Sequence, residues 1–175
     1  MNSRNTRPFL YDNEAYMNTG VQRSGATPLF AKTKNTPGGK MERKKDIMKI
    51  IEAHGDIYAA TASIAYPQDL LKKMQKARTC GKPAFIHVLG PCPTGWEYDS
   101  PLTVEIARLA VETGLQVLYE YENGRRTLSR LPKERKPIEE YLRLQGRFAH
   151  LTPEQIAQTQ EEVDRRFEEI VASAS

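Results

Sequence analysis

Side-chain amides and hydroxyls gather in a polar segment, residues 11–24, that reads Tyr-Asp-Asn-Glu-Ala-Tyr-Met-Asn-Thr-Gly-Val-Gln-Arg-Ser. The segment continues the apolar run Phe9, Leu10 and Tyr11, and a polar loop after a strand is where open α/β sheets bind phosphates and metals. The side chain of Asn13 and the nearby carbonyls are hard oxygen ligands, which Mg²⁺ prefers together with phosphate oxygens. The alternative for Asn13 and Asn18 is turn chemistry, because asparagine tolerates left-handed backbone.

A second candidate is Cys92, which stands between two prolines after the apolar run 83–89. A Pro-Cys-Pro turn beyond a strand fixes the backbone near a thiolate, and iron-sulfur clusters are held by four thiolates. The alternative is a buried free thiol, because cysteine packs as a small hydrophobe. The other cysteine, Cys80, is interpreted as incidental, and a disulfide between the two is not expected in a reducing compartment.

The elements that must position these residues follow a strand-helix rhythm. Asp46 caps a helix whose apolar face is Ile47, Ile50 and Ile51, with Gly55 as its stop, and residues 56–61 form a strand. Pro67 begins a helix with Leu70, Leu71 and Met74 on one face and Gly81 as its stop, followed by a strand over 83–89.

The next helix follows Ser100 and Pro101. It has Val104, Ala107 and Val111 on one face, is closed by Gly114 and is followed by a strand over 115–121. Residues 25–40 are expected to form a long functional loop.

The C-terminal third carries strong local signals. Asn123-Gly124 predicts a two-residue hairpin with an antiparallel edge strand over 125–131. Residues 137–145 look helical, and Thr152-Pro153-Glu154-Gln155 starts a last helix with a capping box. Its apolar stripe is Ile156, Val163, Phe167 and Ile170. We therefore predict an α/β fold, the second half of a doubly wound domain over 1–122, with a hairpin and helical extension over 123–175.

Composition narrows the function. At 175 residues the chain has the length of one domain. Its 26 basic and 22 acidic residues are interspersed and give a net charge of +4, which does not favour nucleic-acid binding. No apolar stretch approaches the roughly 20 residues that span a bilayer, and residues 1–10 lack a secretory signal, so we expect no membrane and a cytoplasmic location. The sequence contains no serine-hydrolase, P-loop or zinc-protease motif, and His87 and His150 have no partner at metal-ligand spacing.

These motifs carry a resemblance. Residues 11–28 resemble the closing half of the thiamine diphosphate motif in the beta subunit of 2-oxoacid:ferredoxin oxidoreductases, those acting on pyruvate above all. The likeness continues through Thr61-Ala62-Ser63-Ile64-Ala65-Tyr66-Pro67, Pro91-Cys92-Pro93-Thr94-Gly95-Trp96, Glu139-Glu140-Tyr141-Leu142 and Gln145-Gly146-Arg147-Phe148. It therefore covers nearly the whole chain.

The resemblance implies three cofactors: thiamine diphosphate, Mg²⁺ and a 4Fe-4S cluster. It implies that Asn13 binds Mg²⁺ through its side chain and Ala15 through its carbonyl, while Asn13, Asn18, Thr19 and Gly20 contact thiamine diphosphate and Cys92 is a cluster ligand. The family's opening Gly-Asp-Gly motif and three further cluster cysteines have no counterpart in these 175 residues.

The implied activity is oxidation of a 2-oxoacid with coenzyme A to acyl-CoA and CO₂, with reduction of ferredoxin. The expected partners are the other subunits of the complex, one of which supplies the Gly-Asp-Gly and cysteine motifs, and ferredoxin. Two alternatives stay open: an inactive truncated fragment or non-enzymatic interaction module, and a subunit specific for branched-chain or aryl 2-oxoacids. The isolated chain is expected to bind neither cofactor nor cluster.

Overall fold

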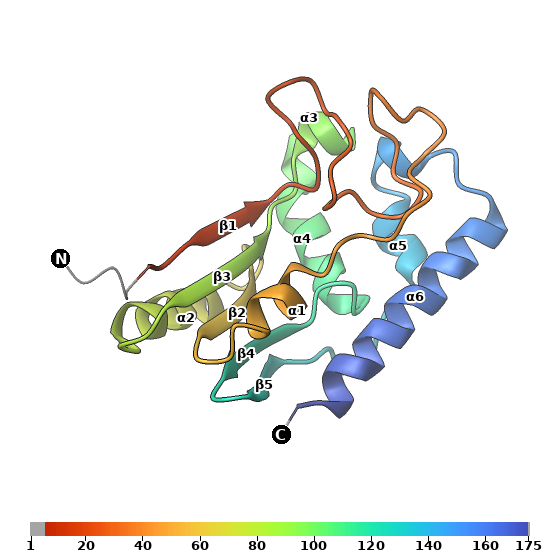
Figure 1. Ribbon diagram of the computed structural model, residues 1–175. Coiled ribbons are helices and arrows are strands. Elements are labelled where there is room, and N and C mark those ends of the chain that lie inside the picture. The colour runs from red at the N-terminus through yellow and green to blue at the C-terminus, as the bar shows by residue number, and fades with distance from the viewer. Residues whose placement is uncertain (1–5, 175) are drawn as a thin grey trace.

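The computed structural model describes residues 6–174. Five strands form one open sheet in the order β1-β3-β2-β4-β5 (Figure 1). Their bounds are β1 Phe9–Asp12, β2 Tyr58–Ser63, β3 Ala84–Leu89, β4 Leu118–Glu122 and β5 Arg125–Arg130. β1, β3 and β2 run parallel, and β4 and β5 complete the sheet in antiparallel pairings. The predicted α/β class and antiparallel hairpin edge are therefore confirmed.

Six α-helices surround this sheet. They are α1 Ile47–Glu52, α2 Pro67–Thr79, α3 Pro93–Trp96, α4 Thr103–Glu112, α5 Ile138–Leu142 and α6 Pro153–Ala172. β2 and β3 are buried on both faces, as parallel strands covered on two sides must be. Ala60 and Ile86 pack toward α2, whereas Ala59 and Phe85 pack toward α1 and α6. A third cluster around Trp96 joins α4, α5 and α6 beyond the strand ends.

Several local signals act as predicted. Asp46 caps α1 by accepting a hydrogen bond from the backbone N–H of Lys49. Both Asn123 and Gly124 have positive φ, as a type I′ turn requires. Thr152 and Gln155 form the reciprocal capping box of α6, and residues 25–40 contain no helix or strand.

The predicted bounds are wrong at four places. β2 and β4 begin two to three residues later than expected, because tight turns after Gly55 and Gly114, both with positive φ, use up the intervening chain. A 3-10 turn, Ser100–Leu102, delays α4 to Thr103. The predicted helix over 137–145 shortens to α5, because Gln145 already leads into a second 3-10 turn, Gly146–Phe148.

Four apolar residues assigned to buried helix faces are about half exposed: Ile50, Leu71, Met74 and Val104. α1 buries Met48 instead, and α4 buries Ile106 and Ala110. α2 buries Lys73, whose ammonium group reaches the carbonyl of Thr61 at 2.8 Å and the carboxylate of Asp69 at 2.6 Å. A charged side chain can be buried when its donors are satisfied in this way.

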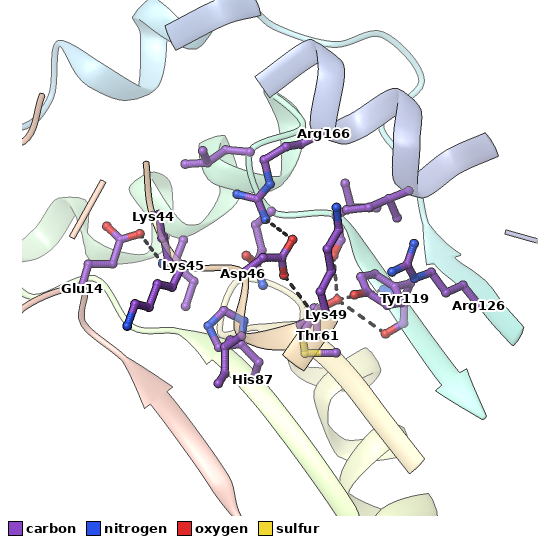
Figure 2. Close-up of a pocket in the computed structure, with 17 residues that line it drawn as sticks. Glu14, Lys44, Lys45, Asp46, Lys49, Thr61, His87, Tyr119, Arg126 and Arg166 are labelled. Carbon is purple, nitrogen blue, oxygen red and sulfur yellow. Dashed lines mark hydrogen bonds and ion pairs between the residues drawn. The ribbon is translucent and has the colours of Figure 1, made fainter. Parts of the chain in front are cut away.

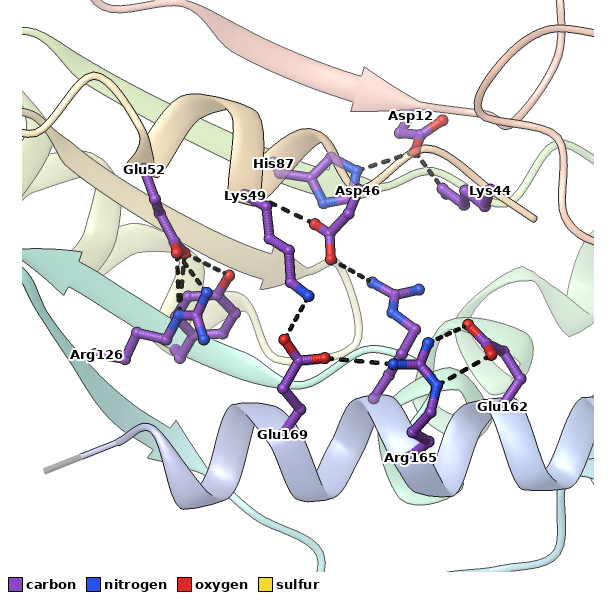
Figure 3. A network of polar contacts seen from close by, with 12 residues as sticks. Asp12, Lys44, Asp46, Lys49, Glu52, His87, Arg126, Glu162, Arg165 and Glu169 are labelled. Carbon is purple, nitrogen blue, oxygen red and sulfur yellow. Dashed lines mark hydrogen bonds and ion pairs between the residues drawn. The ribbon is translucent and has the colours of Figure 1, made fainter.

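Helix α6 lies along the α1 side of the sheet and is fastened there by ion pairs (Figure 3). Lys49 pairs with Glu169, and Asp46 pairs with Arg166 at 3.5 Å. Glu52 of α1 pairs with Arg126 of β5. Because β4 and β5 pair with each other, the sheet continues across residue 122 into the hairpin. No helix within residues 6–174 has the length and hydropathy to cross a membrane.

Candidate functional site

The polar segment predicted from sequence lies at the carboxyl end of β1. Its middle is closed by a two-bond backbone ladder between Tyr16 and Gln22, at 2.9 and 3.1 Å. Within the same loop Glu14, Gly20 and Val21 have φ values of 66°, 100° and 64°. Positive φ is uncommon for glutamate and a genuine outlier for a β-branched residue, and such strain gathers at ligand-binding sites.

The structure places the predicted ligands at different depths in this loop, called the Asn loop below (residues 13–24). Asn13 and Ala15 are half-buried, whereas Asn18 and Thr19 are exposed. The hydroxyl of Thr19 donates to the side-chain oxygen of Gln22 at 3.0 Å. Lys34 lies against Gly20, because a Cβ on this glycine would come within 3.1 Å of its Nζ. The loop thus presents amides and hydroxyls to solvent beside one ammonium group.

Cys92 caps the short helix α3 that follows β3. Its thiol is free and half-buried. Burial raises the pKa of Tyr11, and the nearby Cys92 adds to the rise. Burial likewise raises the pKa of Tyr98, again with a contribution from Cys92. Cys80 follows α2 and precedes β3, so the two cysteines lie at opposite ends of that strand.

The Asn loop and the Cys92 turn form one assembly, because β1 and β3 are neighbours and end side by side. The N–H of Gly90 donates to the carbonyl of Asp12 at 2.8 Å. The indole Nε1–H of Trp96 in α3 donates to the carbonyl of Asn13 at 2.9 Å. The sulfur of Met17 packs so closely on Gly95 that a Cβ there would lie 2.4 Å from it. The structure therefore brings Asn13 and Cys92 into one region although 79 positions separate them.

Beneath this region lies a buried charged network that sequence reasoning missed (Figure 3). Asp12 accepts a hydrogen bond from Nε2 of His87 at 2.9 Å and pairs with Lys44 at 2.7 Å. Glu14 pairs with Lys44 and with Arg147, each at 2.7 Å. These partners are far apart in sequence. A single sequence gives no pattern that shows which distant acidic and basic residues pair with each other.

The network sets the ionisation of Asp12 and Lys44. Burial alone would raise the pKa of Asp12, but the hydrogen bond from His87 and the charge of Lys44 outweigh it and hold this pKa well below the usual range. Burial would lower the pKa of Lys44, but Glu14 and Asp12 raise it above its ordinary value. Asp12 is therefore a carboxylate and Lys44 an ammonium at neutral pH, so His87 must donate the shared proton.

A small cavity of about 50 Å³, lined by charged, polar and apolar side chains, adjoins this network on the α1 side of the sheet (Figure 2). His87 and Gln116 both line it, and Nδ1 of His87 and Nε2 of Gln116 are buried without a hydrogen-bond partner in the described chain. Both atoms are nitrogens that can take part in a hydrogen bond with water. The cavity has the size and polarity that buried ordered water requires, so we interpret it as a hydrated part of the scaffold.

Metal binding by this chain alone is not supported by its acids and thiols. Within residues 6–174 no three His, Cys, Asp or Glu side chains are grouped as a metal site. Asp12 and Glu14 are already engaged by Lys44 and Arg147. The oxygens left for a cation in the Asn loop belong to neutral amides, including that of Asn13, to hydroxyls and to backbone carbonyls; these oxygens suit Mg²⁺ but do not complete its coordination.

The amino-acid sequence is similar to a described protein family and to several characterised proteins. Residues 2–88 match the family described as "Thiamine pyrophosphate enzyme, C-terminal TPP binding domain". The chain is 52% identical over 167 residues to pyruvate synthase subunit PorB of Methanothermobacter marburgensis, and the aligned region covers 93% of this chain and 58% of that protein. It is 51% identical over 170 residues to ketoisovalerate oxidoreductase subunit VorB of Pyrococcus abyssi, covering 93% and 54%. The chain thus spans little more than half the length of these relatives.

A weaker likeness exists to a solved structure, a 2-oxoglutarate:ferredoxin oxidoreductase from Magnetococcus marinus. The TM-score is 0.49 and the identity 22%, over 59% of this chain and 43% of that chain.

Proposed function

We propose that this chain, which belongs to the family of 2-oxoacid oxidoreductase subunits that includes PorB and VorB, is part of a thiamine diphosphate-binding beta subunit. The proposed reaction is the oxidative decarboxylation of a 2-oxoacid with coenzyme A to acyl-CoA and CO₂, with ferredoxin as electron acceptor. When bound, thiamine diphosphate supplies the carbanion and the electron sink that this decarboxylation requires. The expected location is the cytoplasm.

The observation that carries the proposal is the junction of the Asn loop with the Cys92 turn. Its hydrogen bonds, from Gly90 to Asp12 and from Trp96 to Asn13, tie a loop suited to a diphosphate and a cation to a turn suited to a cluster thiolate. An enzyme that moves electrons from a cofactor to an iron-sulfur cluster needs the two groups held near each other in fixed positions. A loop that served only as a turn would not need this second anchor.

The Asn loop fits thiamine diphosphate and Mg²⁺ by the chemistry of its donors. We propose that Asn13 binds Mg²⁺ through its side-chain oxygen and that Ala15 binds it through its carbonyl. Within the described residues, the side-chain oxygen of Asn13 is not used in any hydrogen bond. Asn18, Thr19 and Gly20 would contact the cofactor, and the ammonium group of Lys34 beside Gly20 would favour the diphosphate. Oxygen donors supplemented by phosphate oxygens are what Mg²⁺ prefers.

The Cys92 turn fits one of the four thiolates of a 4Fe-4S cluster. Its thiol is free, half-buried and fixed at the start of α3. The chain contains two cysteines in all, and Cys80 lies at the opposite end of β3. The three other cluster ligands, like the Gly-Asp-Gly aspartate of the family, therefore lie outside these 175 residues, and we propose that the partner subunit expected above supplies them.

The open edge of β1 supports a place for that polypeptide. β1 is the last strand of the sheet, and its outward edge has no strand partner among residues 6–174. The carbonyls of Pro8 and Asp12 accept hydrogen bonds from β3, so those of Phe9 and Tyr11 point outward. The side chains of Phe9 and Tyr11 are 48% and 49% exposed. An unpaired, apolar edge recruits another strand.

The choice of 2-oxoacid stays between two classes. The identities to PorB and VorB relatives, 52% and 51%, do not separate pyruvate from branched-chain 2-oxoacids. We propose pyruvate first and branched-chain or aryl 2-oxoacids as the alternative.

Anaerobic affinity purification of the tagged chain from its own host tests the proposal. Recovery of a partner that carries a Gly-Asp-Gly motif and three cysteines, with iron and thiamine diphosphate in the eluate and 2-oxoacid-dependent ferredoxin reduction, would support it. A chain recovered without such a partner, iron and thiamine would contradict the proposal and favour an inactive fragment. A chain recovered with an unrelated partner and no cofactor would favour an interaction module.

A further inference from the structure

The segment Gln145-Gly146-Arg147-Phe148 contributes no ligand to the proposed site, yet it contacts both the end of α3 and the Asn loop. Gln145, Arg147 and Phe148 are buried. The N–H of Gly146 donates to the carbonyl of Glu97 at the end of α3, at 2.9 Å. A Cβ on Gly146 would lie 2.7 Å from the Cβ of Glu97. A glycine at this position therefore lets the segment approach α3.

Arg147 is held rigidly by its surroundings. Its Nε donates to the side-chain oxygen of Gln145 at 2.9 Å. Its guanidinium carbon, Cζ, lies over the ring of Trp96 at 3.8 Å from the ring centroid. Such cation–π contacts are strongest when desolvated, and Arg147 is only 3% exposed.

The far end of this arginine meets the strained residue of the Asn loop. Nη2 of Arg147 donates to the Glu14 carboxylate at 2.7 Å. Glu14 lies between Asn13 and Ala15 and has a φ of 66°. Its backbone is fixed as well, because its N–H donates to Asp12 at 2.9 Å and its carbonyl accepts from Thr27 at 2.6 Å. A left-handed residue persists only where its surroundings determine it so strongly.

We propose that Arg147 is a positioning residue for the Asn13–Ala15 turn. It grips Glu14 directly and supports Asn13 through Trp96, whose indole donates to the Asn13 carbonyl. Because Trp96 belongs to the helix that Cys92 caps, the same arginine couples the proposed cofactor loop to the proposed cluster turn. This inference rests on the proposed function for the identity of the ligands, but its structural part does not.

Trp96 is the single tryptophan of the chain, so its indole N–H reports on the turn without any cofactor. The ¹⁵N-labelled full chain is compared with R147M, R147K and a matched control, R135M. Arg135 also pairs with a carboxylate, Asp164 at 2.6 Å, and lies over an aromatic ring, Phe167 at 4.5 Å, but it lies between β5 and α5 and both of its partners belong to α6. R147M should move the Trp96 indole signal and speed its hydrogen exchange about tenfold, the factor of one lost hydrogen bond. R147K should give a smaller change, and R135M none.

The second readout is the Mg²⁺-dependent affinity of the purified complex for thiamine diphosphate, which R147M should weaken and R135M should not. A wild-type complex that binds no thiamine diphosphate would refute the proposed function, while the indole measurement would still decide the role of Arg147. An unchanged indole signal and exchange rate in R147M would overturn the inference. If R147M does not fold, E14Q replaces it, because glutamine keeps the size of the side chain and removes the charge that pairs with Arg147 and Lys44; an unchanged Trp96 indole signal and exchange rate in E14Q would then overturn the inference.

Discussion

Arg147 donates to Glu14 at 2.7 Å across 133 positions of sequence, with both side chains almost fully buried. A buried ion pair is weak grounds for stability, because desolvation offsets its attraction, but it can fix one conformation. Here the conformation fixed is a left-handed turn between the two residues proposed as Mg²⁺ ligands. The pair therefore explains why a glutamate stands where glycine would be less strained.

Replacing Asn13 tests the cation site. Asn13→Ala should abolish Mg²⁺-dependent binding of thiamine diphosphate by the complex, because it removes the amide oxygen that we propose as the side-chain ligand of Mg²⁺. The measurement is a calorimetric titration with and without Mg²⁺. The control is Asn35→Ala, which removes an amide that accepts from the N–H of Arg23 at 2.8 Å and steadies the loop without facing a ligand. Equal losses in both variants would mean that Asn13 only supports the loop.

Replacing Cys92 tests the cluster turn. Cys92→Ser should lower the iron content of the purified complex and abolish ferredoxin reduction, because the cluster needs four thiolates. Cys80→Ser is the matched control, since Cys80 is also free and half-buried but lies at the other end of β3. Iron analysis and the visible absorption spectrum give the answer. A Cys92→Ser complex with full iron would place the fourth ligand elsewhere.

A charge on the β1 edge should block assembly. Phe9→Lys places an ammonium group on the open strand, and charged side chains are how natural edges avoid pairing. Recovery of the proposed partner in affinity purification should fall about tenfold or more, and the chain alone should aggregate less. Val104→Lys is the control, because Val104 is 47% exposed against 48% for Phe9 but lies on α4. Equal recovery with Phe9→Lys and wild type would mean that the partner docks elsewhere.

Acid should destabilise the fold through Asp12. Its pKa is lowered from an ordinary value of 3.8, so the stabilisation by Asp12 is fully present above about pH 4 and is lost as the pH falls below that value toward the native pKa. Asp12→Asn should cost on the order of 3 kcal/mol at pH 7, because it leaves buried partners of the carboxylate uncompensated, and should flatten the acid limb. Denaturant midpoints between pH 7 and pH 3 measure both.

The control for this measurement is Asp164→Asn, whose carboxylate is 35% exposed in its pair with Arg135. Partly exposed pairs contribute about 0 to 1 kcal/mol. If Asp12→Asn keeps the wild-type dependence on pH, another acid governs the acid limb.

The sequence predicted those parts of the fold that depend on neighbouring residues. Asp46 and Thr152 cap helices through hydrogen bonds to N–H groups three residues on. Asn123 and Gly124 specify their turn by themselves. Asn13 and Cys92, which stay predictions as site residues, were singled out by local patterns as well: a polar stretch and a proline-flanked stretch, each after an apolar run.

The errors came from contacts that only the folded chain creates. Leu71 and Met74 have helical spacing, yet α2 turns Lys73 inward because Thr61, Asp69 and Ser129 satisfy its ammonium group. His87 received no role because its partner, Asp12, lies 75 positions away. No local pattern marks such pairs. For the pair of Arg147 with Glu14, the one available signal was the segment 145–148, which the family resemblance includes but to which it assigns no functional role.

The antiparallel hairpin has a consequence for how many chains can assemble. At the β5 end, Arg125 and Arg130 are exposed and Arg126 is bridged by the chain near Ala174, so that border repels further strands. Among residues 6–174, the β1 border is the one that lacks such charges and coverage, and it is the border that we propose accepts a strand. A sheet with a single adhesive border has a valence of one: it can join one complementary chain, or one copy of itself about a twofold axis, and then growth stops. Open-ended fibres need two such borders, and the charged and partly covered hairpin border works against the second one.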